Sequence, residues 1–358
     1  MRSLFSPHFV LAGSVALLAS AIPLKAEVDR TQKPAPGPAP AISFPKFKDV
    51  TLPNGLRVCF LQDDRSPTIT FRLMIKSGSA SDGEKTGTAS FAATLLNRGT
   101  TSRDAATFAK ETDFIGSHVE AGAGTDSIAI SASSLNKYTE QLLDLLSDAA
   151  RNPAFPDEQL AKIRKQALSA LEAQKQDSAR LASNLVGKLV FGEHPYGAFQ
   201  TPKSVQSITR QDLVDFHKSH FRPNNACLAI VGDIAPETIL PLVEKVFGNW
   251  EKADVPTKPA PNFPTLKGRT IHLINRPGSV QSNIVVASSG TARNTPDLPE
   301  MTVMNTTLGG SSSGRLYSNL REKHGWTYGS YSRFDLRLQA GVMAVSYTHL
   351  TLPTILLV

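Results

Sequence analysis

Cysteine is scarce in this chain, which has only Cys59 and Cys227 among its 358 residues. Two thiols are too few for a disulfide-rich scaffold, and neither has a second cysteine or a histidine nearby at zinc-ligand spacing. Both lie in predicted strands, so we expect buried thiols, with a disulfide between them as the alternative. Runs of like charge are also absent, since 38 basic and 31 acidic residues are scattered along the sequence. The chain therefore lacks the usual marks of a thiolate metal site and of specific nucleic-acid binding.

The first 26 residues have the composition of a secretory signal peptide. Arg2 supplies a positive start, residues 9–22 are apolar, and Leu-Lys-Ala precedes Glu27 as a cleavage site. The apolar stretch is short and is followed by Pro23 and Lys25, so we expect no firm membrane anchor. We therefore predict an exported, periplasmic protein that begins with a stiff, proline-rich leader over residues 27–45.

Two periodicities dominate the rest of the chain. Polar and apolar residues alternate over 68–75 and 127–134, which is typical of strands with one buried face. Apolar residues recur at helical spacing in the segments 87–98, 104–115, 137–151, 157–191, 209–220 and 236–247. Because groups of strands alternate with long helices, the sequence predicts an α+β fold built of layers.

The pattern is duplicated. Ser-Gly-Ser-Ala at 77–80 is matched by Ser-Gly-Thr-Ala at 289–292, an offset of 212 (289 − 77), and Leu96 meets Leu308 at the same offset. The second copy is shorter, so we predict that it is incomplete and unstable. The end of the chain, Val-Ser-Tyr-Thr-His-Leu-Thr-Leu-Pro-Thr, resembles a translated sequencing adaptor. The predicted segments are a signal peptide (1–26), a leader (27–45), a first domain (46–250), a linker (251–264), an incomplete second domain (265–344) and an artefact (345–358).

Residues 87–100, Gly-Thr-Ala-Ser-Phe-Ala-Ala-Thr-Leu-Leu-Asn-Arg-Gly-Thr, resemble the active-site helix of the pitrilysin/insulinase family of zinc peptidases. That family, which includes the mitochondrial processing peptidase, carries His-x-x-Glu-His where this chain has Ser90, Ala93 and Thr94. Two histidines at i and i+4 on one helix face can bind one Zn²⁺, and the glutamate between them activates a water molecule. The family's third ligand, a glutamate on a long helix, corresponds to Ala170. The resemblance thus implies duplicated two-layer domains with mainly antiparallel sheets, but no metal and no catalytic residue in this chain.

A second segment of the family is retained. Residues 308–317 and 320–328 resemble its second-domain signature, in which an arginine and a tyrosine hold the substrate backbone beside the zinc. The resemblance assigns these roles to Arg321 and Tyr328. A guanidinium can donate to a peptide carbonyl, and a phenol can donate to the oxyanion that forms when water attacks.

Other candidate sites carry weaker signals. His217 and His220 lie three residues apart without a carboxylate that clearly joins them, so we interpret them as side chains on a helix surface. The Gly309-Gly310 pair is not followed by the lysine of a phosphate-binding loop, which argues against nucleotide binding.

The leading hypothesis is a non-catalytic subunit, inactive alone, of an exported heteromeric zinc metallopeptidase. An active homologous subunit would carry the zinc, and this chain would help to bind an extended peptide substrate through Arg321 and Tyr328. Two alternatives remain. One is a structural or assembly subunit with no substrate, as in the inactive core subunits that the family contributes to a respiratory complex. The other is the zinc-dependent metalloendopeptidase activity that the family name alone implies.

Overall fold

The computed structural model describes residues 37–38, 41, 43–257 and 261–350. The predicted signal peptide, most of the leader and residues 351–358 lie outside these ranges, so their predicted roles are untested. No helix within the described ranges is long and apolar enough to cross a membrane.

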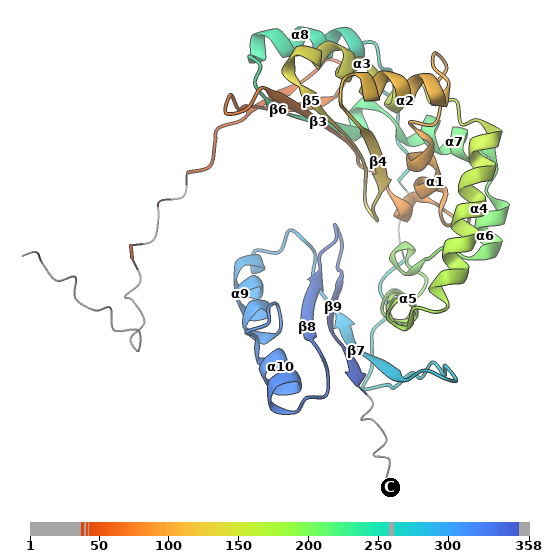
Figure 1. Ribbon diagram of the computed structural model, residues 1–358, viewed down its shortest axis with the longest axis vertical. Coiled ribbons are helices and arrows are strands. Elements are labelled where there is room, and N and C mark those ends of the chain that lie inside the picture. The colour runs from red at the N-terminus through yellow and green to blue at the C-terminus, as the bar shows by residue number, and fades with distance from the viewer. Residues whose placement is uncertain (1–36, 39–40, 42, 258–260, 351–358) are drawn as a thin grey trace, which may run out of the picture. The chain divides into compact units, whose positions relative to one another are not determined.

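A six-stranded sheet organises the first half of the chain (Figure 1). Its order is β1-β2-β6-β3-β5-β4, and β2 and β6 are parallel while the other neighbouring pairs are antiparallel. β6, which comes last of the six in the sequence, therefore lies between β2 and β3. The strands are β1 (Lys48–Thr51), β2 (Arg57–Gln62), β3 (Thr68–Ile75), β4 (Val119–Ala123), β5 (Ile128–Leu135) and β6 (Ala226–Gly232).

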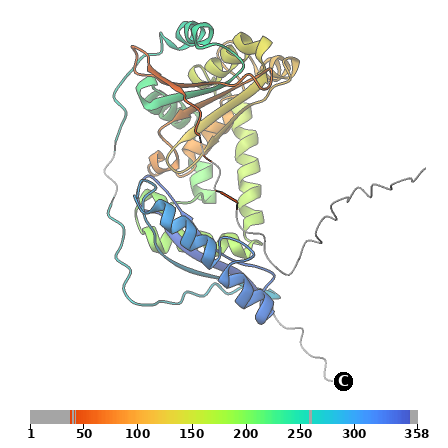
Figure 2. The same cartoon turned by 90° about the vertical axis from the view of Figure 1, so that its left-hand side faces the viewer.

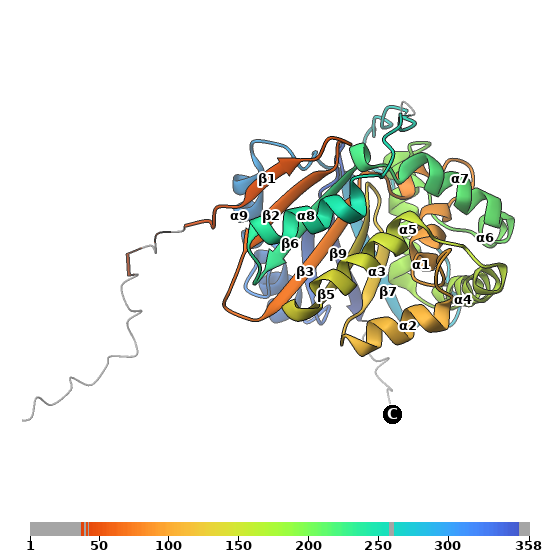
Figure 3. The same cartoon turned by 90° about the horizontal axis from the view of Figure 1, so that it is seen from above.

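Helices cover one face of this sheet. α3 (Thr139–Arg151) and α8 (Pro236–Phe247) lie across its strands, as the view from above shows (Figure 3). The inward-facing residues of β3 alternate strictly with exposed ones, and Ile69, Phe71 and Leu73 have no exposed surface. They share one core with the leucines of α3, so burial of the period-two apolar face holds the two layers together.

The remaining helices of this half lie beside the sheet. In the sequence they fall between β3 and β4 or between β5 and β6. They are α1 (Thr88–Leu95), α2 (Ala105–Phe114), α4 (Asp157–Gln174), α5 (Ser178–Phe191), α6 (Pro202–Ser207) and α7 (Arg210–His220), with 3₁₀ turns η1 (Ser79–Ser81), η2 (Asn136–Tyr138), η3 (Pro195–Gly197) and η4 (Pro223–Asn225). The single helix that we predicted over 157–191 is in fact two helices. The side chain of Asp177 caps the second by accepting a hydrogen bond from the Arg180 N–H.

The second half contains a three-stranded antiparallel sheet of order β7-β9-β8, with helices against it (Figure 2). Its elements are β7 (Gln281–Ser289), α9 (Leu298–Leu308), α10 (Arg315–Tyr317), the π-helical turn η5 (Ser318–Lys323), β8 (Ser330–Asp335) and β9 (Val342–Leu350). At the offset of 212, β7, β8 and β9 correspond to β3, β4 and β5, which are joined in the same order. The α+β class, the mainly antiparallel sheets and the duplication are thereby confirmed.

Three strands of the first copy, β1, β2 and β6, have no counterpart among the described residues of the second. At the same offset, residues 269–274 correspond to β2, yet they form no strand, and Ile271 and Leu273 are 88% and 90% exposed. In the first copy, β2 reaches the sheet only through its hydrogen bonds to β6. No strand within the described residues takes the place of β6 beside β7, so the β2-like segment has nothing to pair with.

The predicted domain boundaries remain predictions. Residues 251–257 and 261–264 contain no helix or strand, as expected of a linker, although Phe263 packs in a small apolar cluster with Phe191 and Tyr196. Residues 345–350, which we predicted to be an artefact, continue β9 in register with Val286 to Gln281 of β7.

Candidate functional site

The helix that corresponds to the family's zinc-binding helix is α1. It begins after Gly87, whose φ of 112° favours glycine. The carboxylate of Asp82 accepts hydrogen bonds from the N–H groups of Gly87 and Ala89, each at 2.7 Å. Burial raises the pKa of Asp82 to about 6, although these two hydrogen bonds act in the opposite direction. Asp82 was not among the residues predicted from the sequence, although an acid just ahead of a helix N-terminus is a recognisable signal.

The three positions of the zinc motif on α1 carry no metal ligand. The hydroxyl of Thr94 donates to the backbone oxygen of Ser90 at 2.8 Å, so the helix itself satisfies it. Ala93 is 1% exposed and offers no proton acceptor. Zinc in proteins is bound by nitrogen, sulfur and carboxylate ligands, and a hydroxyl engaged with a helix carbonyl is a poor substitute. The residues present on α1 therefore do not fit the zinc ion that the family implies.

The third predicted position lies on α4 and gives the same result. Ala170 is exposed, and the nearest acid, Glu172, is also exposed and forms an ion pair of 2.7 Å with Lys175. Across the described ranges, no three His, Cys, Asp or Glu side chains are grouped closely enough to hold a metal ion.

The Gly-Thr pair that follows α1 has a structural role of its own. Gly99 has a φ of 122°, and the Thr100 hydroxyl donates to the buried carboxylate of Asp148 at 2.7 Å. Arg103 donates to the same carboxylate at 2.7 Å and also pairs with Asp144 and Glu111. This network joins the end of α1 to α3 without a metal. It therefore gives Gly99 and Thr100 a structural role although the zinc ligands of the motif are absent.

The two predicted substrate-binding residues lie together. The guanidinium carbon of Arg321, on η5, is 5.1 Å from the ring centroid of Tyr328, a cation–π distance. Tyr328 is 70% exposed. Thr327 fixes the adjacent turn through hydrogen bonds with the N–H and oxygen of Gly329. Within the described residues the Arg321 guanidinium has no hydrogen-bond or ion-pair partner, so its donors are available to a carbonyl or carboxylate.

The interpretation of His217 and His220 as surface side chains is wrong. His217 is half-buried and its Nε2–H donates to the backbone oxygen of Ala150 at 2.8 Å. Burial lowers its pKa to about 4. His220 is 7% exposed, its Nδ1 lies 3.1 Å from the Ser77 hydroxyl, and burial lowers its pKa as well. Both histidines are structural.

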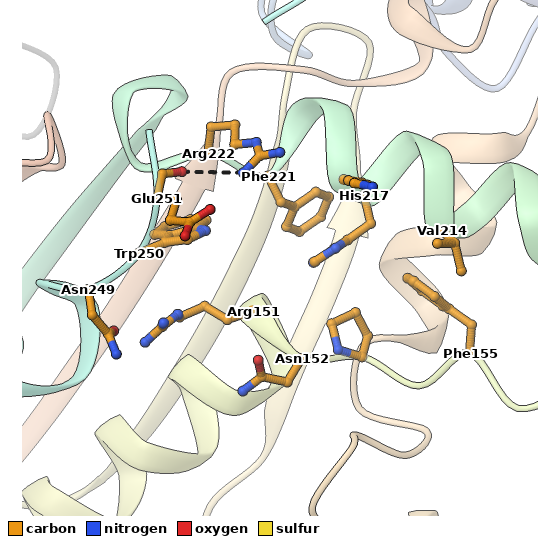
Figure 4. A pocket seen from close by; sticks show the side chains of 12 residues that line it. Arg151, Asn152, Phe155, Val214, His217, Phe221, Arg222, Asn249, Trp250 and Glu251 are labelled. Carbon is orange, nitrogen blue, oxygen red and sulfur yellow. Dashed lines mark hydrogen bonds between the residues drawn. The ribbon is translucent and has the colours of Figure 1, made fainter. Parts of the chain in front are cut away.

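A pocket of about 460 Å³ lies at the ends of α3 and α7. His217 lines it, whereas the positions of the zinc motif and the Arg321–Tyr328 pair do not (Figure 4). Two arginines face it, but each is engaged with the backbone. Arg151 donates to the oxygen of Val246, and Arg222 donates to the oxygen of Glu251 at 3.4 Å. Val246 is in the last turn of α8 and Glu251 lies in the segment after it, so these two bonds join segments of the fold. The Nε atoms of both arginines are buried without a hydrogen-bond partner among the described residues.

Comparison with protein families assigns both halves of the chain. Residues 57–198 match the model described as insulinase (peptidase family M16), and residues 207–349 match the model described as peptidase M16 inactive domain. The two matches include α1 and the segment that carries Arg321 and Tyr328, respectively.

Similar sequences have names from the same family. The chain is 24% identical over 299 residues to an uncharacterized zinc protease of Mycobacterium leprae, which covers 82% of this chain and 67% of that relative. It is 26% identical over 273 residues to a probable mitochondrial-processing peptidase subunit beta of Arabidopsis thaliana, covering 75% of this chain and 51% of the relative. The chain thus spans about half to two thirds of these two relatives.

Solved structures give the same result. A peptidase M16 inactive domain from Pseudomonas fluorescens superposes with a TM-score of 0.80 at 29% identity, covering 85% of this chain and 74% of that one. The periplasmic protease PqqL from Escherichia coli, at 15% identity, shares the fold with a TM-score of 0.68 over 85% of this chain and 35% of its own length. Both family models, the similar sequences and the shared fold agree that this chain belongs to the insulinase (M16) peptidase family.

Proposed function

We propose that this chain is a non-catalytic subunit that assists a homologous zinc peptidase in binding peptide substrates. The observation that supports this most directly is the chemistry of α1, where the motif positions carry a serine, an alanine and a threonine. Without two imidazoles and a carboxylate on the same face, the chain has no means to bind zinc there or to activate water. A hydrolytic role then requires ligands from a second polypeptide.

The Arg321–Tyr328 pair is the part of this chain that we assign to substrate. The ring of Tyr328 limits the freedom of the guanidinium without using its N–H donors, so the donors stay aligned at little entropic cost when a ligand binds. A planar fork of donors suits the backbone carbonyls of an extended peptide. Sequence-tolerant peptide binding is the expected result, because main-chain groups are common to all peptides.

The partner that we propose is a family member with an intact His-x-x-Glu-His motif, exported with this chain to the periplasm. Three observations support this: the signal-like first 26 residues, the similarity of residues 207–349 to a domain described as inactive, and the similarity to a relative whose printed name is that of a subunit. The zinc would belong to the partner, and this chain would hold no cofactor.

The test compares peptide hydrolysis by the co-purified pair with and without the double substitution R321A/Y328F. We expect the pair to stay assembled on size-exclusion chromatography while kcat/KM falls about tenfold or more, since a guanidinium and a hydroxyl that contact substrate are lost. The matched control is R333A/Y331F, which removes the same groups from exposed positions on β8 and should leave kcat/KM unchanged.

Two results would argue against the proposal. Unchanged kcat/KM in R321A/Y328F would favour a purely architectural subunit. If the isolated chain binds about one zinc ion and cleaves peptide in a chelator-sensitive way, then it is a peptidase by itself, and our account of α1 is wrong.

A further inference from the structure

The two cysteines of the chain, 168 positions apart in sequence, meet on neighbouring strands. Cys59 lies on β2 and Cys227 on β6, and their sulfur atoms are 4.0 Å apart. Both side chains are half-buried, on the face of the sheet opposite to the core-facing Val58 and Phe60. We propose that Cys59 and Cys227 form a disulfide that fastens β2 to β6.

In the register of the two strands, Cys59 lies opposite Ala229 and Cys227 lies opposite Arg57, so the two cysteines are diagonal neighbours. Bond formation therefore requires a local shift of β2 against β6 as well as a change in the side chains. A disulfide bond is about 2.0 Å long, so the sulfur atoms must approach each other by about 2 Å. Cysteine side chains change rotamer about χ1, and both cysteines are partly exposed. The chain contains no third cysteine, so within one molecule each thiol has a single possible partner.

The Cys59 thiol is poorly suited to catalysis. Burial, the neighbouring Cys227 sulfur and Asp49 raise the pKa of Cys59 to about 11. A thiol with so high a pKa is protonated at neutral pH and is a weak nucleophile. This argues against a thiol that cycles in a reaction. Because disulfide exchange also proceeds through the thiolate, formation of the bond is expected to be slow without a catalyst.

The chemistry is a thiol–disulfide exchange. One cysteine, as its thiolate, attacks the disulfide of an oxidised thiol oxidoreductase or of oxidised glutathione and forms a mixed disulfide. The second cysteine then attacks the sulfur atom of the first cysteine, and the oxidant leaves as a thiol. Together Cys59 and Cys227 lose two protons and two electrons, and the oxidant gains both electrons as its disulfide is reduced.

The position of the bond explains what it would stabilise. β2 is joined to the rest of the sheet only through β6, because its other neighbour is the short edge strand β1. A covalent bond between β2 and β6 would close a long loop and restrict the unfolded chain, which is how disulfides stabilise in the chain-entropy model. It would also prevent the N-terminal β1-β2 pair from detaching.

The experiment incubates the purified full chain with oxidised glutathione and a catalytic amount of disulfide isomerase. It then traps free thiols with an alkylating agent before mass spectrometry. We expect an unalkylated chain lighter by two hydrogen atoms, with a melting temperature on the order of 10 °C above that of the chain in dithiothreitol. In the control C59S/C227S, dithiothreitol should not change the melting temperature.

The alternatives are distinguishable in the same spectra. Alkylation of both cysteines in most molecules, a persistent glutathione adduct on one of them, or disulfide-linked dimers would each overturn the proposal. None of these outcomes depends on a partner peptidase, so the result is independent of the proposed function.

Discussion

At the scale of single residues, His217 is the side chain whose burial has the clearest consequence for pH. Its pKa is lowered to about 4 in the folded chain, against about 6.5 in the unfolded chain. For a base with a lowered pKa, the stabilisation is complete above pH 6.5 and is lost as the pH falls toward 4. Folding therefore weakens with acid, because the unfolded chain takes up a proton that the folded chain resists.

We predict that substitution of His217 removes this loss of folding stability in acid. Between pH 7 and pH 4.5, the free energy of unfolding should fall by about 2 kcal/mol more in the wild type than in H217Q, measured by denaturant titration at both values. Asp82, with a raised pKa, titrates with the opposite sign, and His194 and His220 titrate with the same sign, but all three are common to both proteins. The control H118Q alters an exposed histidine and should follow the wild type. Equal pH dependence in H217Q and wild type would contradict the prediction.

The burial of these histidines could have been inferred from the sequence. His217 follows Leu213 by four residues, and His220 follows Phe216 by four, so both lie on the apolar face of α7. The absence of a carboxylate beside them argues only against a metal site, whereas the helix period determines which face they occupy. What the sequence cannot supply is the partner on the other side, since Ala150 and Ser77 come from segments distant along the chain.

At the scale of elements, the turn after α1 shows how the retained Gly99-Thr100 pair contributes to stability. Thr100 in this turn donates to Asp148, a carboxylate that is 6% exposed. We predict that T100V, which keeps the side-chain shape, lowers the free energy of unfolding by about 1 to 3 kcal/mol. The substitution removes a donor to a buried carboxylate and the oxygen that accepts from the N–H groups of Ser102 and Arg103. Denaturant unfolding at pH 7 measures the effect.

The neighbouring threonine provides the matched control. Thr101 is exposed, and the turn uses only its backbone N–H, which donates to the oxygen of Asn152. T101V should therefore change the free energy of unfolding by no more than about 0.5 kcal/mol. If T100V and T101V have equal effects, the Thr100–Asp148 contact does not stabilise the end of α1, and our explanation of the retained Gly-Thr pair fails.

The elements were predictable where a local pattern determines them. The alternation of 68–75 predicted β3, and the repeat at an offset of 212 predicted the duplication, with which the shared strand order of the two sheets agrees. The same repeat does not predict that residues 269–274, which correspond to β2, form no strand. Strand formation there depends on a partner that is distant in sequence. For the site, the sequence sufficed to identify Ser90, Ala93 and Thr94, but the stacking of Arg321 on Tyr328 required the fold.

At the scale of the whole molecule, the two sheets differ in how firmly they are held. β3 is hydrogen-bonded on both edges, by β5 and β6, and its inward side chains are fully buried. β7 is paired within the described residues only with β9, and its Val286 is 64% exposed. α9 contributes no buried residue. The second copy thus has the strand order of the first with much less buried apolar surface to stabilise it.

We predict that this difference appears in native-state hydrogen exchange. Amide protons of β7 that are bonded to β9 should exchange at least about 100-fold faster than those of β3, because the smaller sheet can open without unfolding the larger one. β5 is the control, since it shares its core with β3 and should exchange at a similarly slow rate. Equal protection of β7 and β3 would mean that both sheets unfold as one cooperative unit. In that case the contacts of Phe191 and Tyr196 with Val342 and Ala344 must couple the two halves more strongly than their small cluster suggests.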